Sequence, residues 1–260
     1  MEFILASVLF IFGLCVGSFL NVLADRLPRE ESVVKGRSHC EKCRKELTWR
    51  DLIPLVSFVF LKGKCRYCRI RLSLYYPTVE LTTGVMFVLA FFHVEFKIYD
   101  LGFMISLAYY LFIVSSLVVV FFTDLKYGII PDKVIFPAAL VSLLYLFINP
   151  NSLILNHLLS AGGAGLFFLF LFLITRGKGM GFGDVKFAFL MGLVLGFPDV
   201  VVSLYIAFLT GAIVGCILIV WRKRRLKGTS IAFGPFLVLG TFLAMFWGEL
   251  IFQKITSVLR

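Results

Sequence analysis

The chain has 260 residues, of which 60% are hydrophobic, and it carries a formal net charge of +11 at pH 7. A mean hydropathy of +0.97 excludes an ordinary soluble globular domain and predicts a polytopic membrane protein. Because a bilayer core needs about 20 mostly apolar residues per helix, the apolar runs predict an all-α fold of about eight transmembrane helices. The runs cover residues 2–24, 78–94, 101–123, 133–149, 156–175, 185–197, 199–221 and 231–252.

The first run, residues 2–24, has the length of a transmembrane helix. A secretory signal is the alternative, but the run exceeds the usual h-region, has no basic n-region, and continues into GSFLNVLADRLP instead of a small-residue cleavage site. We therefore expect three parts: transmembrane helix one (1–24), a segment outside the bilayer (25–77), and a membrane domain of seven helices (78–260).

Lys and Arg concentrate in alternate connections between the predicted helices. The connections after the first, third, fifth and seventh helices hold 23 of the 26 residues of these types. Since cytoplasmic loops carry the excess of Lys and Arg, these connections are predicted to be cytoplasmic, and both termini external or periplasmic. Topology thus explains the charge without nucleic acid as a partner. Membrane lipid is the expected partner, and the basic loop WRKRRLKG can lie against anionic headgroups.

The segment 25–77 contains HCEKC and KCRYC, two Cys-x2-Cys pairs separated by 21 residues. Their cysteines are Cys40, Cys43, Cys65 and Cys68. Two such pairs are typical of a tetrahedral structural zinc site, because each pair presents two thiolates to one metal. Two disulfides or four unpaired thiols are the alternative, although a reducing cytoplasm disfavours disulfides. His39, beside the first pair, is surplus to four-coordination.

Acidic residues at the cytoplasmic ends of the predicted helices are the candidates for chemistry, because a carboxylate near hydrocarbon is costly and usually functional. They are Glu80, Asp124, Asp132 and Asp184. Acidic residues at the external ends are expected to be solvated: Glu2, Glu95, Asp100, Asp199 and Glu249.

Asp124 and Asp184 are separated by two complete crossings, so both return to the cytoplasmic face and can meet. Asp184 is expected near the positive N-terminus of a helix, which favours its ionised form, and Asp124 near a negative C-terminus, which opposes ionisation. Two carboxylates that share one proton can activate water and protonate a leaving amide nitrogen, as in aspartic proteases.

Glycines lead up to Asp184 and leave an extended approach on which a substrate backbone can dock. They are Gly179, Gly181 and Gly183. The structural alternative for Asp184 is a helix N-cap, and a capping role also explains Asp132. A helix C-terminus gives Asp124 no such benefit. Paired carboxylates also bind Mg²⁺, which is a further alternative for the two aspartates.

At these residues the chain closely resembles the type IV prepilin peptidase family, a group of membrane aspartic proteases marked by Gly-x-Gly-Asp. Six blocks stand in the family's order and span almost the whole chain. They are GSFLNVLADRLP, the cysteine pairs bracketing IPLVSF, YPTVELTTG, TDLKYGIIPD, GFGDVKFAFLMG and FGPFL. A lone Gly-x-Gly-Asp would be unspecific, but six ordered blocks are not.

The resemblance implies cleavage of the short basic leader from type IV prepilins or type II secretion pseudopilins, at the cytoplasmic face of the bacterial inner membrane. Asp124 and Asp184 would be the catalytic pair, with Gly181 and Gly183 in the active-site loop and no metal at the aspartates. The resemblance also implies that S-adenosylmethionine methylates the newly exposed N-terminal residue.

The cysteine segment is the expected place for methyl transfer, and its candidate residues by resemblance are Gly63, Lys64 and Glu80. An ordinary turn before a cysteine pair is the alternative for Gly63 and Lys64. For Glu80 the alternative is stabilisation of a helix N-terminus.

Two other functions fit the same residues. A membrane transporter can use Asp124 and Asp184 as an ion or proton relay, although the cysteine segment does not suit that role. A noncatalytic scaffold of a pilus or secretion system can retain the same helices and metal module as a docking platform.

Overall fold

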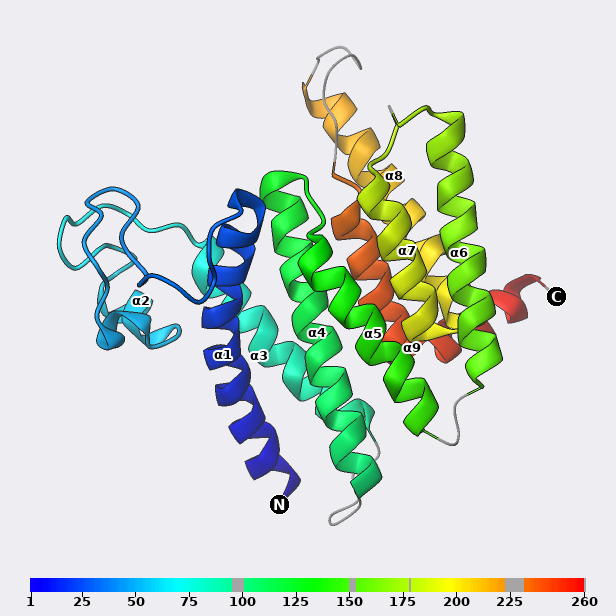
Figure 1. Cartoon of the computed structure of the whole chain (residues 1–260), viewed down its shortest axis with the longest axis horizontal. Helices are drawn as coiled ribbons and strands as arrows, with labels where there is room; N and C mark the ends of the chain where they lie inside the picture. The colour runs from blue at the N-terminus through cyan, green and yellow to red at the C-terminus, as the bar shows by residue number, and fades with distance from the viewer. Residues whose placement is uncertain (95–100, 150–152, 178, 223–231, 260) are drawn as a thin grey trace. The chain divides into compact units, whose positions relative to one another are not determined.

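The computed structural model describes residues 1–94, 101–149, 153–177, 179–222 and 232–259, and their regular secondary structure is helical (Figure 1). The helices are α1 (Glu2–Arg26), η1 (Leu27–Arg29), η2 (Trp49–Leu52), α2 (Val56–Phe60), α3 (Tyr75–His93), α4 (Leu101–Tyr127), α5 (Asp132–Ile148), α6 (Ile154–Ile174), α7 (Phe182–Leu195), α8 (Asp199–Arg222) and α9 (Gly234–Leu259). The predicted all-α class is confirmed for these residues. Glu95, Asp100 and the basic loop beyond Arg222 lie outside them.

Among the residues that the structure describes, six helices are long and apolar enough to cross a membrane, namely α1 with η1, α3, α4, α6, α8 and α9. The predicted runs 133–149 and 185–197 correspond to α5 and α7, which have 17 and 14 residues. Both are shorter than the roughly 20 residues that a straight bilayer crossing requires. The structure therefore supports six candidate spans, and eight crossings stay a prediction.

The chain divides into two compact units, Met1–Phe122 and Thr123–Arg260. In the first unit α1 packs along α3, and in the second α6 packs along α7 and α8 along α9. Asp124 and Asp184 both belong to the second unit, and the four clustered cysteines belong to the first. The predicted boundaries at residues 24 and 77 follow the membrane surface instead of these contacts, so they stay a prediction.

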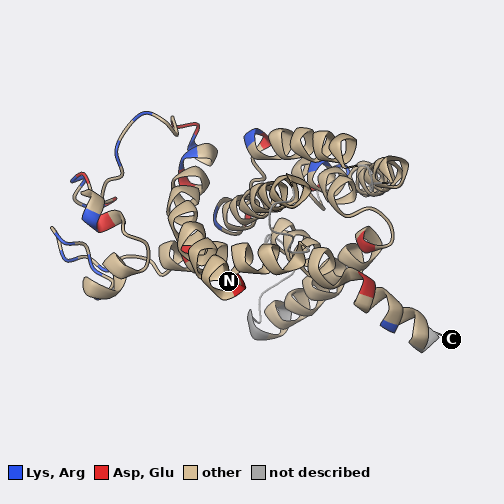
Figure 2. Cartoon of the chain, turned by 90° about the horizontal axis from the view of Figure 1, so that it is seen from below, with Lys and Arg blue, Asp and Glu red and all other residues tan. Residues whose placement is uncertain are grey.

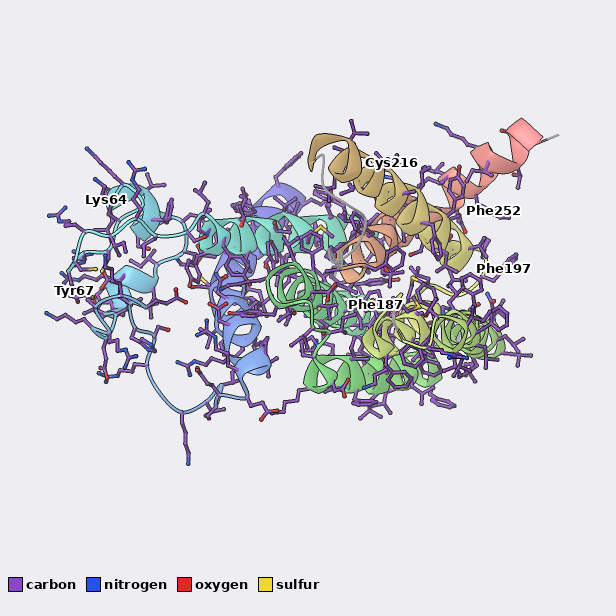
Figure 3. All side chains as sticks on the ribbon, turned by 90° about the horizontal axis from the view of Figure 1, so that it is seen from above. Lys64, Tyr67, Phe187, Phe197, Cys216 and Phe252 are labelled. Atoms are coloured by element: carbon purple, nitrogen blue, oxygen red, sulfur yellow. The ribbon has the colours of Figure 1, made fainter. Side chains whose placement is uncertain are left out.

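Glycines allow the helices of each unit to approach closely. In the first unit a Cβ on Gly13 would lie 2.8 Å from the Cα of Gly84, and one on Gly17 would lie 2.7 Å from the Cα of Glu80. In the second unit Gly192 of α7 faces the backbone of α6, and the neighbouring Phe187 is fully buried (Figure 3). Small residues at such interfaces let two backbones come together without a driving force from water.

We expect Gly192→Ala to lower the thermal unfolding midpoint of the detergent-solubilised protein by several degrees. The new Cβ would lie 2.5 Å from the carbonyl oxygen of Ser160 and 2.6 Å from the Cα of Ala161, so α6 and α7 must separate. Gly163→Ala on α6 is the matched control, because a Cβ there has no neighbour within 4 Å. Equal midpoints for the two variants would show that this contact does not limit stability.

Candidate active site and metal centre

Asp184 lies in the first turn of α7, where its carboxylate turns back toward the start of the helix. Gly181 precedes the helix with an extended backbone (φ −77°, ψ 153°), and its N–H donates to Asp184 Oδ2 over 3.1 Å. The N-cap interpretation of Asp184 is therefore wrong, because Gly181 occupies that position. The predicted location at a positive helix N-terminus is confirmed, and this end of a helix favours a carboxylate.

The two glycines of the predicted active-site loop have different surroundings. A Cβ on Gly181 would have no neighbour closer than 3.8 Å, so this position leaves space beside the carboxylate of Asp184. Gly183 is already inside α7, and a Cβ there would lie 3.0 Å from Cβ of Ile130. Gly181 is thus extended, whereas residues 179 and 180 form a bend, so the predicted extended approach is not observed before Gly181. Gly183 lets α7 pack against the chain just before α5.

Asp124 lies in the last turn of α4, as predicted, but a second helix end also faces it. The backbone N–H of Gly234, the first residue of α9, hydrogen-bonds to the Asp124 carboxylate. A Cβ on Gly234 would lie only 2.5 Å from Asp124 Oδ2. The predicted place near the C-terminus of a helix is confirmed, and the positive N-terminus of α9, which the sequence analysis did not identify, also supports the charge of Asp124. The sequence signal was FGPFL, a Gly-Pro pair at a helix start.

The structure brings Asp124 and Asp184 together as a buried pair. Their side chains are 5% and 6% exposed, and the charge of Asp124 acts electrostatically on Asp184. Oδ2 of Asp124 is buried and has no hydrogen-bond partner among the described residues. Two carboxylates in such a site favour sharing one proton, because both charges together are costly in a low dielectric. The unpartnered oxygen is one that the shared proton can occupy.

Asp132 serves a different purpose from the predicted helix cap. It is the first residue of α5 and makes no side-chain capping bond, so the capping interpretation is wrong. Its two carboxylate oxygens each lie 2.7 Å from Nζ of Lys186, two residues after Asp184. The ammonium group also lies over the rings of Phe136 and Phe182, at 5.7 and 5.2 Å. This ion pair fixes the beginning of α7 to the beginning of α5, and sequence reasoning missed Lys186.

Asp199 is less solvated than its predicted external location suggests. It begins α8, next to Gly248 of α9, and its Oδ1 is buried without a hydrogen-bond partner among the described residues. It follows α7, whereas Asp184 begins that helix, so the two acids lie at opposite ends of α7.

The four predicted metal ligands form one cluster in the first unit. One sulfur from each of Cys40, Cys43, Cys65 and Cys68 lies within 4.8 Å of all the others, and all four are free thiols. Four Zn–S bonds of about 2.3 Å in a tetrahedron would put the sulfurs about 3.8 Å apart. The Cys40 and Cys68 sulfurs are 3.8 Å apart, so this cluster fits a tetrahedral metal ion.

The two cysteine pairs are built alike. Cys40 N–H donates to the carbonyl of Lys45, and Arg44 N–H donates to the carbonyl of Cys40, with Arg44 at a φ of +52°. The second pair repeats both bonds and the positive φ. Its corresponding residues are Cys65, Ile70 and Arg69. Backbone N–H groups in these turns hydrogen-bond to the sulfurs of Cys40 and Cys68, which stabilises thiolates of the kind that bind a metal ion.

The thiols differ in acidity although they share one cluster. Burial raises the pKa of Cys40, but the N–H groups of Cys43 and Lys42 and the adjacent thiols outweigh burial and lower its pKa to about 7. The Ile70 N–H lowers the pKa of Cys68, but burial and the neighbouring thiols raise it to about 11. The thiolate of Cys40 therefore forms readily, whereas ionisation of Cys68 is opposed. Binding of a metal ion to all four thiolates must therefore release protons.

The candidates for methyl transfer lie in and beside the same segment. Gly63 has a φ of +65° and lies in the turn that follows α2, as the alternative interpretation expected. Lys64, labelled in Figure 3, lies in an isolated β-bridge with Arg71 across the second cysteine turn, so it is not itself a turn residue. Glu80 lies beyond the first turn of α3. The alternative interpretation, that Glu80 stabilises the N-terminus of this helix, is therefore wrong. Oε2 of Glu80 accepts the N–H of Leu55 over 2.8 Å, which ties α3 to the segment but reaches neither Gly63 nor Lys64.

The described part of the chain has six candidate spans, a buried aspartate pair at converging helix ends and a four-cysteine cluster. These features define a polytopic membrane protein with a paired-carboxylate centre. Residues 11–94 match the model of the bacterial peptidase A24 N-terminal domain, and residues 111–216 match that of the type IV leader peptidase family. The chain belongs to the type IV leader peptidase family. The second match contains both Asp124 and Asp184, and the first contains all four clustered cysteines.

Curated relatives extend over most of the chain. A prepilin leader peptidase/N-methyltransferase of Bacillus subtilis is 33% identical over 245 residues, which are 94% of each chain. Proteins of the same name from Myxococcus xanthus and Pseudomonas aeruginosa are 32% and 28% identical. Those two matches cover 84% and 96% of this chain, and 64% and 92% of the relatives. No solved structure matches the chain significantly.

We expect the purified protein to contain about one tightly bound metal ion per chain, and Cys40→Ser or Cys65→Ser to reduce that ratio to about a tenth or less. Both cysteines are buried in the cluster, and serine supplies no thiolate. Cys216→Ser, on α8, is the matched control and keeps the metal. Elemental mass spectrometry measures the ratio, and full metal content in Cys40→Ser would contradict a four-thiolate site.

Proposed function

We propose that the protein is an aspartic endopeptidase that removes the leader peptide from type IV prepilins or type II secretion pseudopilins. The observation that carries this proposal is the buried pair of Asp124 and Asp184, with one carboxylate oxygen left without a partner. The names of the relatives, prepilin leader peptidase/N-methyltransferase, supply the substrate class.

The geometry supports hydrolysis by a shared-proton pair. In the proposed reaction one ionised carboxylate takes a proton from water, whose oxygen attacks the scissile carbonyl carbon. The protonated carboxyl donates its proton to the amide nitrogen, and the carbon–nitrogen bond breaks. The pair titrates as a unit, so the acid and base roles belong to the pair and not to one residue. The chemistry needs no metal at the two aspartates.

Three contacts hold the carboxylates in place for this reaction. The N–H groups of Gly181 and Gly234 hydrogen-bond to Asp184 and Asp124. The ion pair between Asp132 and Lys186 holds the first turn of α7 against α5. The space beside Gly181 provides room for an extended substrate backbone next to Asp184.

The proposed location is the bacterial cytoplasmic membrane, with the aspartates and the cysteine segment on the cytoplasmic side. In this topology α5 and α7 also cross, which gives eight crossings and external or periplasmic termini. Burial of α7 among α5, α6 and α9 supports a short crossing, because protein neighbours replace lipid along its length. A prepilin, itself an apolar helix with its leader on the cytoplasmic side, would reach the aspartates in the correct orientation.

We also propose a second activity, methylation of the new N-terminal residue with S-adenosylmethionine as donor. The relatives' names include N-methyltransferase, and the segment with the four cysteines lies in the longest stretch between the candidate spans, residues 30–74. A structural zinc ion at these cysteines would fold the segment. Gly63, Lys64 and Glu80 stay the candidate residues.

In membranes containing a prepilin, Asp124→Asn and Asp184→Asn should each reduce leader removal by at least about 100-fold, because an amide cannot exchange the shared proton. Asp199→Asn is the matched control, since Asp199 is another poorly solvated acid of the second unit at the opposite end of α7. Gel mobility of the prepilin measures cleavage, and a protease-protection assay checks insertion. Normal processing by either dyad variant would reject the peptidase proposal in favour of a transporter or a scaffold.

The same assay with a labelled methyl donor separates one activity from two. Product mass after incubation with the purified protein shows either loss of the leader alone or that loss followed by a gain of one methyl group. The dyad variants should abolish both changes, because methylation requires the amine that cleavage exposes.

Gly234→Ala should also reduce cleavage by at least about tenfold, because its Cβ would displace the Asp124 carboxylate from the N-terminus of α9. Gly215→Ala on α8 is the matched control, since a Cβ there has no neighbour within 4 Å. Cleavage rates at saturating prepilin test this. Wild-type rates in Gly234→Ala would mean that the α9 N-terminus does not position Asp124.

A further inference from the structure

The segment between α1 and α3 exposes an apolar surface that the proposed chemistry does not use. It comes from η2 and α2, and we call it the α2 surface. Its exposed residues are Trp49, Leu52, Ile53, Val56, Val59 and Phe60. Trp49 and Phe60 are 71% and 84% exposed, far more than large apolar side chains of a domain surrounded by water usually are.

The local fold explains why these side chains face outward. Helix α2 has five residues, and Phe58 turns back against Gly63, where a Cβ would lie 3.1 Å from its ring. Phe58 therefore covers the inner side of the turn. Val59 and Phe60, in contrast, are 71% and 84% exposed, so the described part of the chain leaves both largely uncovered.

Positive charges follow the apolar residues directly. Between residues 52 and 79 the sequence contains five basic residues and no Asp or Glu. All five are exposed: Lys62, Lys64, Arg66, Arg69 and Arg71. Arg66 forms an ion pair with Asp51 over 2.6 Å. The other four basic residues have no Asp or Glu beside them in the sequence between residues 52 and 79. Figure 2 shows basic residues recurring along the loops of the segment.

Both ends of the segment continue into candidate membrane spans. Helices α1 and α3 pack along each other, so the chain between them is held at one surface of the membrane. An exposed apolar helix next to a run of Lys and Arg is the pattern of a segment that lies in the bilayer interface, where Trp is also favoured. Positive charges near the bilayer attract anionic headgroups.

We propose that the α2 surface docks on an anionic lipid bilayer, with Trp49, Val59 and Phe60 inserted at the headgroup level and the basic residues contacting lipid phosphates. This docking would orient the cysteine segment against the membrane that holds α1 and α3. The proposal does not depend on peptidase activity. The basic leader of the proposed substrate is a poorer occupant, because this run of cations would repel it.

The test uses the full-length protein in lipid nanodiscs and the fluorescence of Trp49. The chain has three Trp residues, so Trp221→Phe and Trp247→Phe leave Trp49 as the sole probe. Lipids brominated near the headgroup end of the acyl chain should quench it at least about twofold more in discs containing phosphatidylglycerol than in phosphatidylcholine discs. About 1 M salt should reduce the difference, because the Debye length falls to about 3 Å.

Matched variants separate docking from unfolding. Val59→Asp and Phe60→Asp should each reduce quenching, whereas Val34→Asp, at a 93% exposed position outside the α2 surface, should not. Lys62→Gln with Arg71→Gln should remove the preference for anionic lipid. Retained metal content shows that each variant is folded. A control variant with Trp49→Phe and Trp221→Phe keeps only Trp247, on α9. The fluorescence of Trp247 in this variant should be quenched equally in both kinds of disc.

Three results would overturn the proposal. The first is equal quenching of Trp49 in neutral and anionic discs, and the second is quenching unchanged by Phe60→Asp. The third is quenching that changes only when a prepilin is added, which would assign the α2 surface to the substrate.

Discussion

The burial of two carboxyl groups at converging helix ends is the constraint on which the second unit depends. Burying Asp124 and Asp184 is tolerable only because polar backbone groups face them: the first N–H groups of α7 and α9, supplied at Gly181 and Gly234. A side chain at Gly234 would separate the Asp124 carboxylate from this backbone N–H, because its Cβ would lie 2.5 Å from Asp124 Oδ2. The termini of α4, α7 and α9 are thus arranged around the pair.

The contacts around the aspartate pair support that arrangement. Lys186 lies on the same turn of α7 as Asp184, and its ion pair with Asp132 holds this turn against α5. At the other end of α7, Gly192 permits contact with the α6 backbone. A helix fixed at both ends can hold a carboxylate with the precision that catalysis requires.

In the first unit, the segment between α1 and α3 is short and charged, and it has to fold next to a membrane. Its two cysteine turns meet at a cluster of four sulfurs that could hold a metal ion, and binding of an ion there would be coupled to folding of the segment. Glu80 links the segment to α3 through the N–H of Leu55. The apolar side chains that remain outside, including Phe60, then become available to a surface such as the bilayer.

The amino-acid sequence by itself determined the helical membrane class and singled out the four clustered cysteines and the two buried aspartates, because these follow from hydropathy, fixed spacing and the rarity of acids near hydrocarbon. Only the tertiary structure decided what supports them: Gly234 against Asp124, Lys186 against Asp132, and Glu80 against Leu55. These partners are 110, 54 and 25 residues apart in the sequence, and no local pattern encodes them. Periodicity and spacing report neighbours along one helix or turn, whereas the packing of whole helices sets which distant ends meet.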